Sequence, residues 1–219
     1  MLDSLLYLAT GVFAGLASGL LGVGGGLIIV PMLFYIFGTQ NLPGEHLMHM
    51  ALATSLATII ITSISSARAH HRKQAVLWPV FLSLAPGICL GAWLGGLAAS
   101  EIKTDILKPA FGIFELIVAL HLLWNRQSAQ HHVTLNKIKS ALGGFIIGLI
   151  SATVGIGGGT LTVPFLHWHN IAMRKAVATS AACGFPIAVF GAASYIYAGW
   201  SVPNLPPQTF GYVHLTAFS

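Results

Sequence analysis

The chain has 219 residues, of which 55% are hydrophobic and only 7% are Asp, Glu, Lys or Arg. An ordinary soluble domain carries roughly a quarter of charged residues, so this composition excludes a typical water-soluble fold and indicates an integral membrane protein. The formal net charge of +5 comes from ten Lys and Arg that lie scattered in short connections. Such scattered cations are typical of topology signals, so nucleic-acid binding is not predicted.

Apolar stretches long enough to cross about 30 Å of hydrocarbon follow one another along the chain. The first begins almost at the start and lacks both a basic leader and a cleavage site, so we expect it to be retained in the fold. The sequence therefore predicts an all-α fold, that of a polytopic helical membrane protein. The stretches cover 4–44, 46–67, 74–100, 140–173 and 176–219, and a sixth at 109–124 is interrupted only by Glu115.

An internal repeat organises these stretches. GLASGLLGVGGGLIIVPML at 15–33 aligns with GLISATVGIGGGTLTVPFL at 148–166, with three consecutive glycines and a Val-Pro pair at the same places. An Ala-Thr-Ser triplet follows in both copies, at 53–55 and at 178–180. Each repeat therefore carries two signatures of small and polar residues.

The repeat divides the chain into three parts. We predict a first repeat at 1–125, a polar connector at 126–139 and a second repeat at 140–219. The first copy continues into two more predicted helices after its Ala-Thr-Ser triplet. The second copy stops where its third helix is expected to begin, so we expect it to be incomplete at the C-terminus, as in a fragment.

The glycine triplets are predicted to break the membrane helices that contain them. Glycine costs up to about 1 kcal/mol relative to Ala in a helix interior, and Pro31 and Pro164 are expected to add a second interruption. Broken backbone survives in lipid only where protein buries it or a polar cavity hydrates it. A half-helix that begins at the glycines points its amides and positive dipole end at that place, which suits an anion. Paired broken helices are the sequence sign of a carrier site.

The candidate substrate-binding residues are therefore the glycines, the two prolines and the hydroxyl residues of the triplets. The alternative for the glycines is close helix packing without a ligand, and for the hydroxyls a hydrogen bond to a carbonyl one turn earlier. Duplication of the whole pattern favours binding for the glycines, whereas both interpretations stay open for the hydroxyls. The residues are Gly24, Gly25, Gly26, Pro31, Thr54, Ser55, Gly157, Gly158, Gly159, Pro164, Thr179 and Ser180.

Glu115 is the only acidic residue inside a predicted span, which makes it a candidate for proton coupling. The alternative is a neutral carboxyl hydrogen-bonded between helices. Arg68 and His71, at the inner end of the second predicted helix, could hold an anion at the cytoplasmic mouth, although such residues more often fix topology.

Chemistry other than transport is not predicted. Histidine pairs such as His46 and His49 lack the Cys, Asp or Glu that would complete a coordination shell, so no metal is expected and no cofactor is implied. No nucleophile elbow, zinc-protease motif or phosphate-binding loop occurs, so the chain is not predicted to be an enzyme.

The distribution of Lys and Arg favours re-entrant hairpins. If 4–37 and 140–168 each cross once, the two sides collect six and four cations, whereas re-entrant hairpins give eight and two. The positive-inside rule places the larger group in the cytoplasm, together with the connector 126–139. Each complete repeat then crosses three times, so the second copy is inverted. The eight are Arg68, Arg72, Lys73, Arg126, Lys137, Lys139, Arg174 and Lys175, with Lys103 and Lys108 opposite.

The glycine-Val-Pro segments, the Ala-Thr-Ser triplets and SSARAHHRKQAV at 65–76 together resemble the TauE/SafE sulfite exporter family of membrane permeases over nearly the whole chain. The resemblance implies a two-repeat carrier of about eight hydrophobic segments in the cytoplasmic membrane, which moves sulfite, sulfoacetate or other small organic anions. The chain departs from that pattern by ending before the last two segments.

The expected function is therefore a secondary carrier that exports such an anion, with the anion and the lipid bilayer as its partners. The alternative is a non-transporting membrane scaffold or subunit whose glycines pack helices. A homo-oligomer is compatible with either function.

Overall fold

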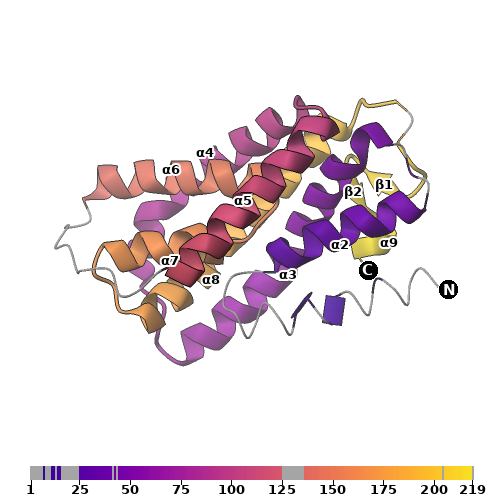
Figure 1. Cartoon of the computed structure of the whole chain (residues 1–219). Helices are drawn as coiled ribbons and strands as arrows, with labels where there is room; N and C mark the ends of the chain where they lie inside the picture. Colours follow the sequence, from indigo (N-terminus) through magenta and orange to yellow (C-terminus); the bar gives the residue numbers. More distant parts are fainter. Residues whose placement is uncertain are drawn as a thin grey trace.

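The structure is a computed structural model that describes residues 7, 11–12, 14–15, 25–40, 42, 44–124, 136–203 and 205–218. Helices make up nearly all of it, which confirms the all-α prediction (Figure 1). The elements are α2 (Gly26–Thr39), η1 (Gly44–His46), α3 (Leu47–Arg72), α4 (Trp78–Ser100), α5 (Thr104–Trp124), α6 (Lys137–Val154), α7 (Gly159–Trp168), α8 (Met173–Gly199), β1 (Thr209–Phe210), β2 (Val213–His214) and α9 (Leu215–Phe218).

Three helices in the described part are long and apolar enough to cross a membrane. They are η1 with α3 at Gly44–Arg72, α4 at Trp78–Ser100 and α8 at Met173–Gly199. Residues 125–135, which hold most of the predicted connector, lie outside the described residues, and the repeat boundaries stay a prediction.

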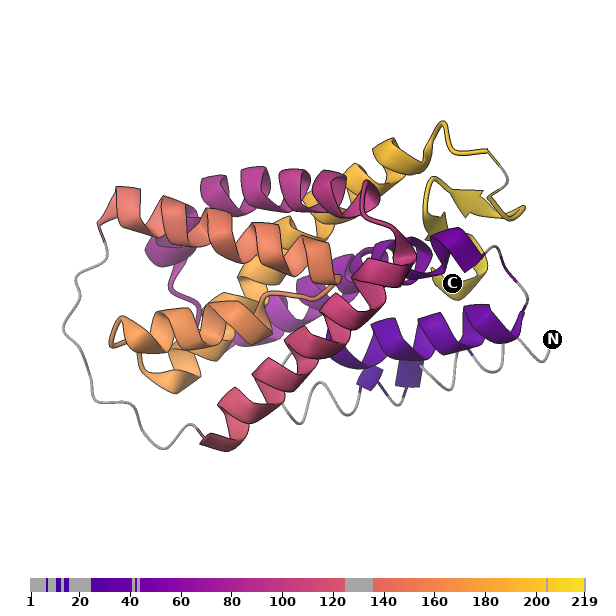
Figure 2. The same ribbon diagram turned by 45° about the horizontal axis from the view of Figure 1, so that its top comes forward.

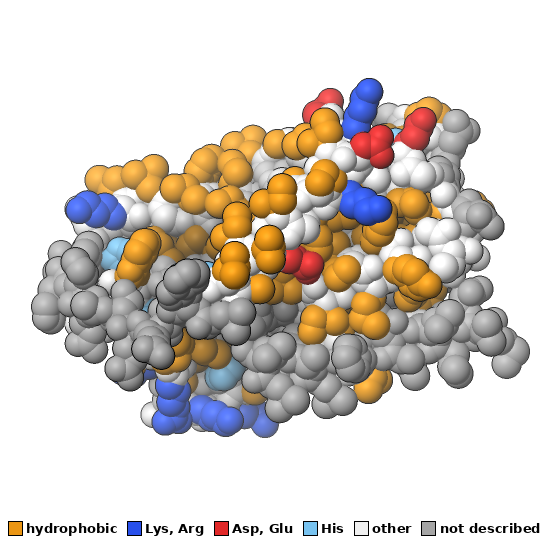
Figure 3. Space-filling view, viewed as in Figure 1, with side chains coloured by type: hydrophobic (Ala, Val, Ile, Leu, Met, Phe, Trp, Pro, Cys, Tyr) orange, Lys and Arg blue, Asp and Glu red, His pale blue; other side chains and the backbone are white. Residues whose placement is uncertain are grey.

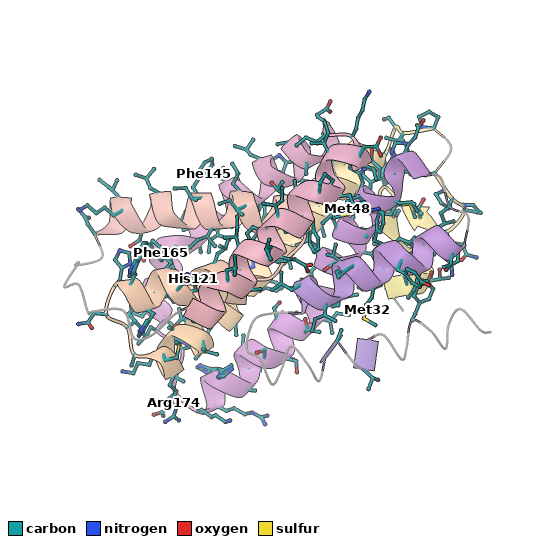
Figure 4. The ribbon with its side chains drawn as sticks, in the orientation of Figure 1. Met32, Met48, His121, Phe145, Phe165 and Arg174 are labelled. Atoms are coloured by element: carbon teal, nitrogen blue, oxygen red, sulfur yellow. The ribbon has the colours of Figure 1, made fainter. Side chains whose placement is uncertain are left out.

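Most of the described charged side chains lie at the two ends of the helix bundle, whereas Glu115 lies halfway along α5 (Figure 3). We call the end where α3 stops and α6 and α8 start the basic end, since no acidic residue among those described lies there. The opposite end, with η1 and the turn between α4 and α5, is the acidic end. Figure 4 shows Phe165 and Arg174 towards the basic end and Met48 towards the acidic end. The described basic-end cations are Arg68, Arg72, Lys73, Lys139, Arg174 and Lys175, and the acidic-end charges are Glu45, Glu101, Lys103, Asp105 and Lys108.

The helices α6 and α7 form a hairpin whose outer ends both lie at the basic end (Figure 2). The fold-back is visible in the packing, because a side chain at Gly143 of α6 would meet the ring of Phe165 in α7. With 10 residues, α7 is about 15 Å long and too short to span a bilayer. The fold-back of α7 on α6 agrees with the re-entrant prediction, and the position of the segment in the bilayer stays a prediction.

The end of α2 lies at the acidic end of the bundle, next to residue 7. The Tyr7 hydroxyl donates a hydrogen bond to Gln40 Oε1 at 2.8 Å, and the Tyr7 ring contacts Phe37. Residue 7 and the end of α2 therefore lie side by side, whereas residues 16–24 between them lie outside the described residues. The helix α2 begins at Gly26, which the repeat aligns with Gly159, the first residue of α7.

The two prolines do not interrupt these helices, which corrects the sequence prediction. Pro31 lies inside α2 and Pro164 inside α7, each as the sixth residue. A proline removes one backbone N–H and so one helical hydrogen bond. Neighbouring helices and local adjustment tolerate that loss in membrane helices, so the helix continues on both sides.

Matched hydrogen bonds cross between the two halves of the chain. The backbone N–H of Leu77, just before α4, donates to Thr179 Oγ1 at 3.0 Å. The N–H of His214, just before α9, donates to Thr54 Oγ1 at the same distance. Thr54 and Thr179 are equivalent in the repeat, and α9 begins where the third helix of the second copy was expected. The sequence did not indicate the β1–β2 hairpin that precedes it.

Glycines also let α4 and α6 pack backbone to backbone. Side chains at Gly87, Gly91 and Gly95 of α4 would collide with the carbonyls of Ala141, Phe145 and Leu149 in α6. The spacing of four residues on both helices places every glycine on one face, which is typical of small-residue packing in membranes. This contact fixes the first half of the chain to the second.

We predict that Gly91→Ala destabilises the protein by about 1–3 kcal/mol, because the added methyl group must displace the Phe145 carbonyl. Gly112→Ala in α5 is the matched control, since nothing lies within 4 Å of a side chain there. Its helix propensity predicts unchanged or slightly higher stability. Thermal unfolding in detergent checks both variants, and equal midpoints for the two would contradict the packing argument.

Candidate functional site

The second glycine segment is a true helix break at residues 155–158. Gly155 ends α6 in the left-handed region at φ 70°, which glycine adopts without steric cost. The N–H of Ile156 donates to Ser151 O at 2.9 Å and that of Gly155 to Ala152 O at 3.3 Å, so the last carbonyls of α6 are satisfied in a Schellman motif.

The N-terminus of α7 faces this break without a side-chain cap from the described residues. The first bond along α7 runs from Thr162 N–H to Gly158 O at 3.0 Å, so the amides of its first turn have no acceptor within the helix. These amides and the helix dipole make the break a place that favours negative charge.

The two glycine segments meet at this break. A side chain at Gly26 would lie 2.5 Å from Gly155 O and 2.7 Å from Ile156 Cα. The start of α2 therefore rests directly on the break between α6 and α7. Gly25 is the residue before α2, whereas Gly24 lies outside the described residues.

Both Ala-Thr-Ser triplets also reach the break. Ser55 Oγ in α3 donates to Gly155 O at 2.8 Å, and both groups are buried. On the other side, a side chain at Gly158 would lie 2.5 Å from Ser180 O and 2.8 Å from Gly184 N in α8. The structure thus brings residues from all four signatures to one place.

The hydroxyls of the triplets are engaged with protein groups in this conformation. Ser180 Oγ donates to Val177 O at 2.8 Å within its own helix, as the alternative interpretation expects. Thr54 and Thr179 accept the backbone N–H bonds that join the halves. These hydroxyls therefore hold the surrounding helices in position.

Two further hydroxyls flank the break, and sequence reasoning did not select them. Ser151 in the last turn of α6 and Thr162 in α7 are both fully buried, at 0% exposure. Their Oγ and Oγ1 atoms have no hydrogen-bond partner within the described part of the chain. Ser151 aligns with Ser18 in the repeat, so the duplication could have indicated it. Thr162 aligns with Ile29, so the duplication does not indicate it.

Adjacent glycines of the break differ in the space beside them. The backbone of α8 fills the space beside Gly158, whereas a side chain at Gly157 would meet only Ile59, at 3.4 and 3.8 Å. Those distances are ordinary van der Waals contacts. Close helix packing therefore explains Gly158 but not Gly157.

The remaining candidates lie elsewhere. Pro31 is exposed and Pro164 is half-buried. Glu115 is half-buried on α5, next to the exposed Leu116 and Ile117, and α5 packs mainly on α3 and η1. These contacts do not bring Glu115 to the break.

A pocket of about 270 Å³ opens near the basic end between α3, α4 and α8. Its walls are apolar except for Arg68 and His71, and His71 Nδ1 accepts a hydrogen bond from Trp78 Nε1 at 3.2 Å. The pocket lies within one turn of the break, because Ile64 and Phe185 in its wall follow Ser63 and Gly184, which meet beside Gly158. The lining residues are Ile64, Ala67, Arg68, His71, Trp78, Phe81, Ala182 and Phe185.

Comparison with known proteins gives a family and several relatives. The family model described as sulfite exporter TauE/SafE matches residues 7–218. A Haemophilus influenzae relative named "Probable membrane transporter protein" is 37% identical over 214 residues, which cover 97% of this chain and 81% of that protein. A Methanocaldococcus jannaschii relative, also named as a membrane transporter, is 29% identical over 202 residues, covering 88% of this chain and 72% of that protein.

A third relative, from Bacillus subtilis and named "Probable membrane transporter protein YunE", is 26% identical over 235 residues, covering 94% of this chain and 85% of that protein. No solved structure matches the chain. The family match over residues 7–218, together with the apolar helices and the repeated glycine segments, shows that this chain belongs to the sulfite exporter TauE/SafE family of membrane transporters.

Proposed function

We propose that the protein is a secondary carrier that moves a small sulfur-containing or organic anion, such as sulfite or sulfoacetate, out across the cytoplasmic membrane. The observation that carries this proposal is the convergence of Gly26, Ser55 and the α8 backbone on the broken helix at 155–158. A buried break with an uncapped helix start offers an anion amides and a positive dipole end. The family, described as sulfite exporters, favours a small sulfur-containing anion as the substrate class.

The pocket at the basic end supplies the route to this site in the proposal. Arg68 is its only cation, and no acidic residue among those described lies at the same end. The surrounding charge attracts anions towards the opening. By the positive-inside rule this end faces the cytoplasm, so the pocket admits the anion from the inside.

The scaffold function remains the second candidate because one observation favours it. Gly26 and Gly158 touch backbone so closely that packing alone accounts for them. The two functions make different predictions for Gly157. Helix packing does not require a glycine there, whereas an anion that approaches the amides needs the space that a side chain would occupy.

We predict that Gly157→Ala leaves the thermal midpoint near that of the unchanged protein but slows anion flux roughly tenfold or more, since the methyl group occupies the approach to the break. The measurement is counterflow of labelled sulfite and sulfoacetate in proteoliposomes. Gly158→Ala is the matched control, in which we expect loss of stability from the clash with α8.

Unchanged flux in a folded Gly157→Ala variant would remove the break from the transport path. Absence of flux of both anions with well-folded unchanged protein would instead favour the scaffold.

We further predict that Arg68→Gln raises the anion concentration needed for half-maximal flux roughly tenfold, because a charge-assisted hydrogen bond contributes about 1.5–3 kcal/mol. Arg72→Gln removes a cation from the same end but not from the pocket wall, and it should have a much smaller effect. Equal effects of the two variants would show that general attraction, and not the pocket, governs entry.

A further inference from the structure

A cluster of rings lies at the acidic end of the bundle. His46 in η1 and His49 in α3 lie with ring centroids 6.0 Å apart, and Tyr212 from the β1–β2 hairpin contacts both, at 5.6 and 5.1 Å. Tyr195 of α8 adds an edge contact to Tyr212 at 6.4 Å. The cluster therefore joins α3, α8 and the hairpin.

The geometry of His49 fixes which of its ring nitrogens carries hydrogen. The side chain is only 3% exposed, and Nε2 lies 2.9 Å from the carbonyl oxygen of Ile102. A carbonyl oxygen only accepts hydrogen bonds, so Nε2 is the protonated nitrogen. The neutral ring then holds a lone pair on Nδ1, which is buried and has no partner among the described residues.

His46 repeats this feature, since its Nδ1 is also buried without a partner in the described part of the chain. No third His, Cys, Asp or Glu among the described residues joins them in a group that could hold a metal.

The other titratable groups around the pair leave these nitrogens unpartnered. Glu45 precedes His46 in η1, and Glu101 and Lys103 lie in the turn between α4 and α5, all three exposed to solvent. The hairpin contributes Tyr212 and His214, and α8 contributes Tyr195. Burial lowers the pKa of His214, and burial together with the Glu101 charge raises the pKa of Tyr212, so both are neutral at neutral pH while the cluster is closed.

A proton on Nδ1 of His49 would create a buried charged ring whose new N–H has no acceptor. Such a charge costs several kcal/mol unless water or a carboxylate reaches it. Exposed carboxylates lie close by at this end, so separation of the rings relieves the cost. A ligand that binds one of two conformations better shifts the population towards it.

We infer that His49, packed against His46 and Tyr212, forms a proton-binding site, in which one proton taken up from solution by His49 Nδ1 opens the acidic end of the carrier. The inference rests on the proposed carrier function and adds the control of its gate. Loss of the proton to the same solution restores the neutral ring and lets the cluster close.

Hydrogen bonds connect the ring cluster to the break at 155–158. The Tyr195 hydroxyl donates to Ala152 O at 3.3 Å, in the last turn of α6. His214 N–H holds Thr54, whose neighbour Ser55 holds Gly155 O. Movement of the hairpin therefore alters two groups that brace the break.

Hydrogen exchange of the hairpin amides in lipid nanodiscs tests the inference. If the closed state binds no proton and the open imidazole has its ordinary pKa of about 6.5, opening increases about tenfold between about pH 7.5 and about pH 5.5. We expect protection of residues 209–218, corrected for intrinsic exchange, to fall by that factor. His49→Gln keeps a donor near the Ile102 carbonyl but cannot titrate, so its protection should lose the tenfold change and depend much less on pH.

Two control variants identify the responsible ring. His214→Asn keeps a partner for Thr216, and His169→Asn keeps a donor near the Phe165 carbonyl at the basic end. Both should retain the tenfold change. Absence of the change in the unchanged protein, its persistence in His49→Gln or its loss in His214→Asn would overturn the proton site.

Counterflow of sulfite and sulfoacetate by the same preparations separates this inference from the proposed function. Counterflow without the tenfold change overturns the proton site and leaves the carrier. The tenfold change without counterflow supports the proton site and overturns the carrier of these anions.

Discussion

A bilayer interior offers no water to an unpaired backbone group, and the form of the break at 155–158 follows from that constraint. The left-handed turn at Gly155 lets two N–H groups return to the carbonyls of α6. The carbonyl of Gly155 itself receives the Ser55 hydroxyl from α3. Each neighbour of the break therefore has a defined place, because a shift of α3 would leave a buried carbonyl without its donor.

The same constraint binds the two halves of the chain to each other. Thr54 and Thr179 each accept the backbone N–H just before a helix in the opposite half. The glycines of α4 lie against the carbonyls of α6 with no side chains between them. Such contacts resist sliding, because small displacements bring backbone atoms into collision. We therefore expect α4 and α6 to move as one body and the larger changes to occur at the basic-end pocket and the acidic-end rings.

Much of this arrangement could be predicted from sequence because it rests on backbone needs that only a few residue types meet. The duplicated glycines marked the break, and the count of Lys and Arg favoured the hairpin that α6 and α7 form. Pro31 and Pro164 misled the prediction, since a membrane helix tolerates the loss of one hydrogen bond. The glycine segments of both repeats lie at the break, but their spacing in the sequence does not predict that Gly26 packs against Gly155.

Other features depend on contacts between distant segments and leave no local pattern. The sequence alone offers His46 and His49, three residues apart, only as possible metal ligands, because the residue that contacts both rings, Tyr212, lies far along the chain. In the sequence Thr162 cannot be distinguished from any other threonine in an apolar helix. The structure distinguishes it, because its Oγ1 is buried without a hydrogen-bond partner among the described residues. The short β1–β2 hairpin follows prolines that predict only a loop.

The two neighbouring glycines of the break show why composition alone does not assign a role. Gly157 and Gly158 both lack a side chain, are both buried and belong to the same repeat signature, yet of the two only Gly158 leaves no room for a Cβ beside the backbone of α8. A scaffold needs the close packing at Gly158 but does not need the space beside Gly157. A carrier needs both, since α8 must hold the broken helix in place while the amides stay within reach of an anion. Packing and anion binding therefore both constrain this segment. Gly157, which has space beside it, is the position where a substitution can distinguish the two.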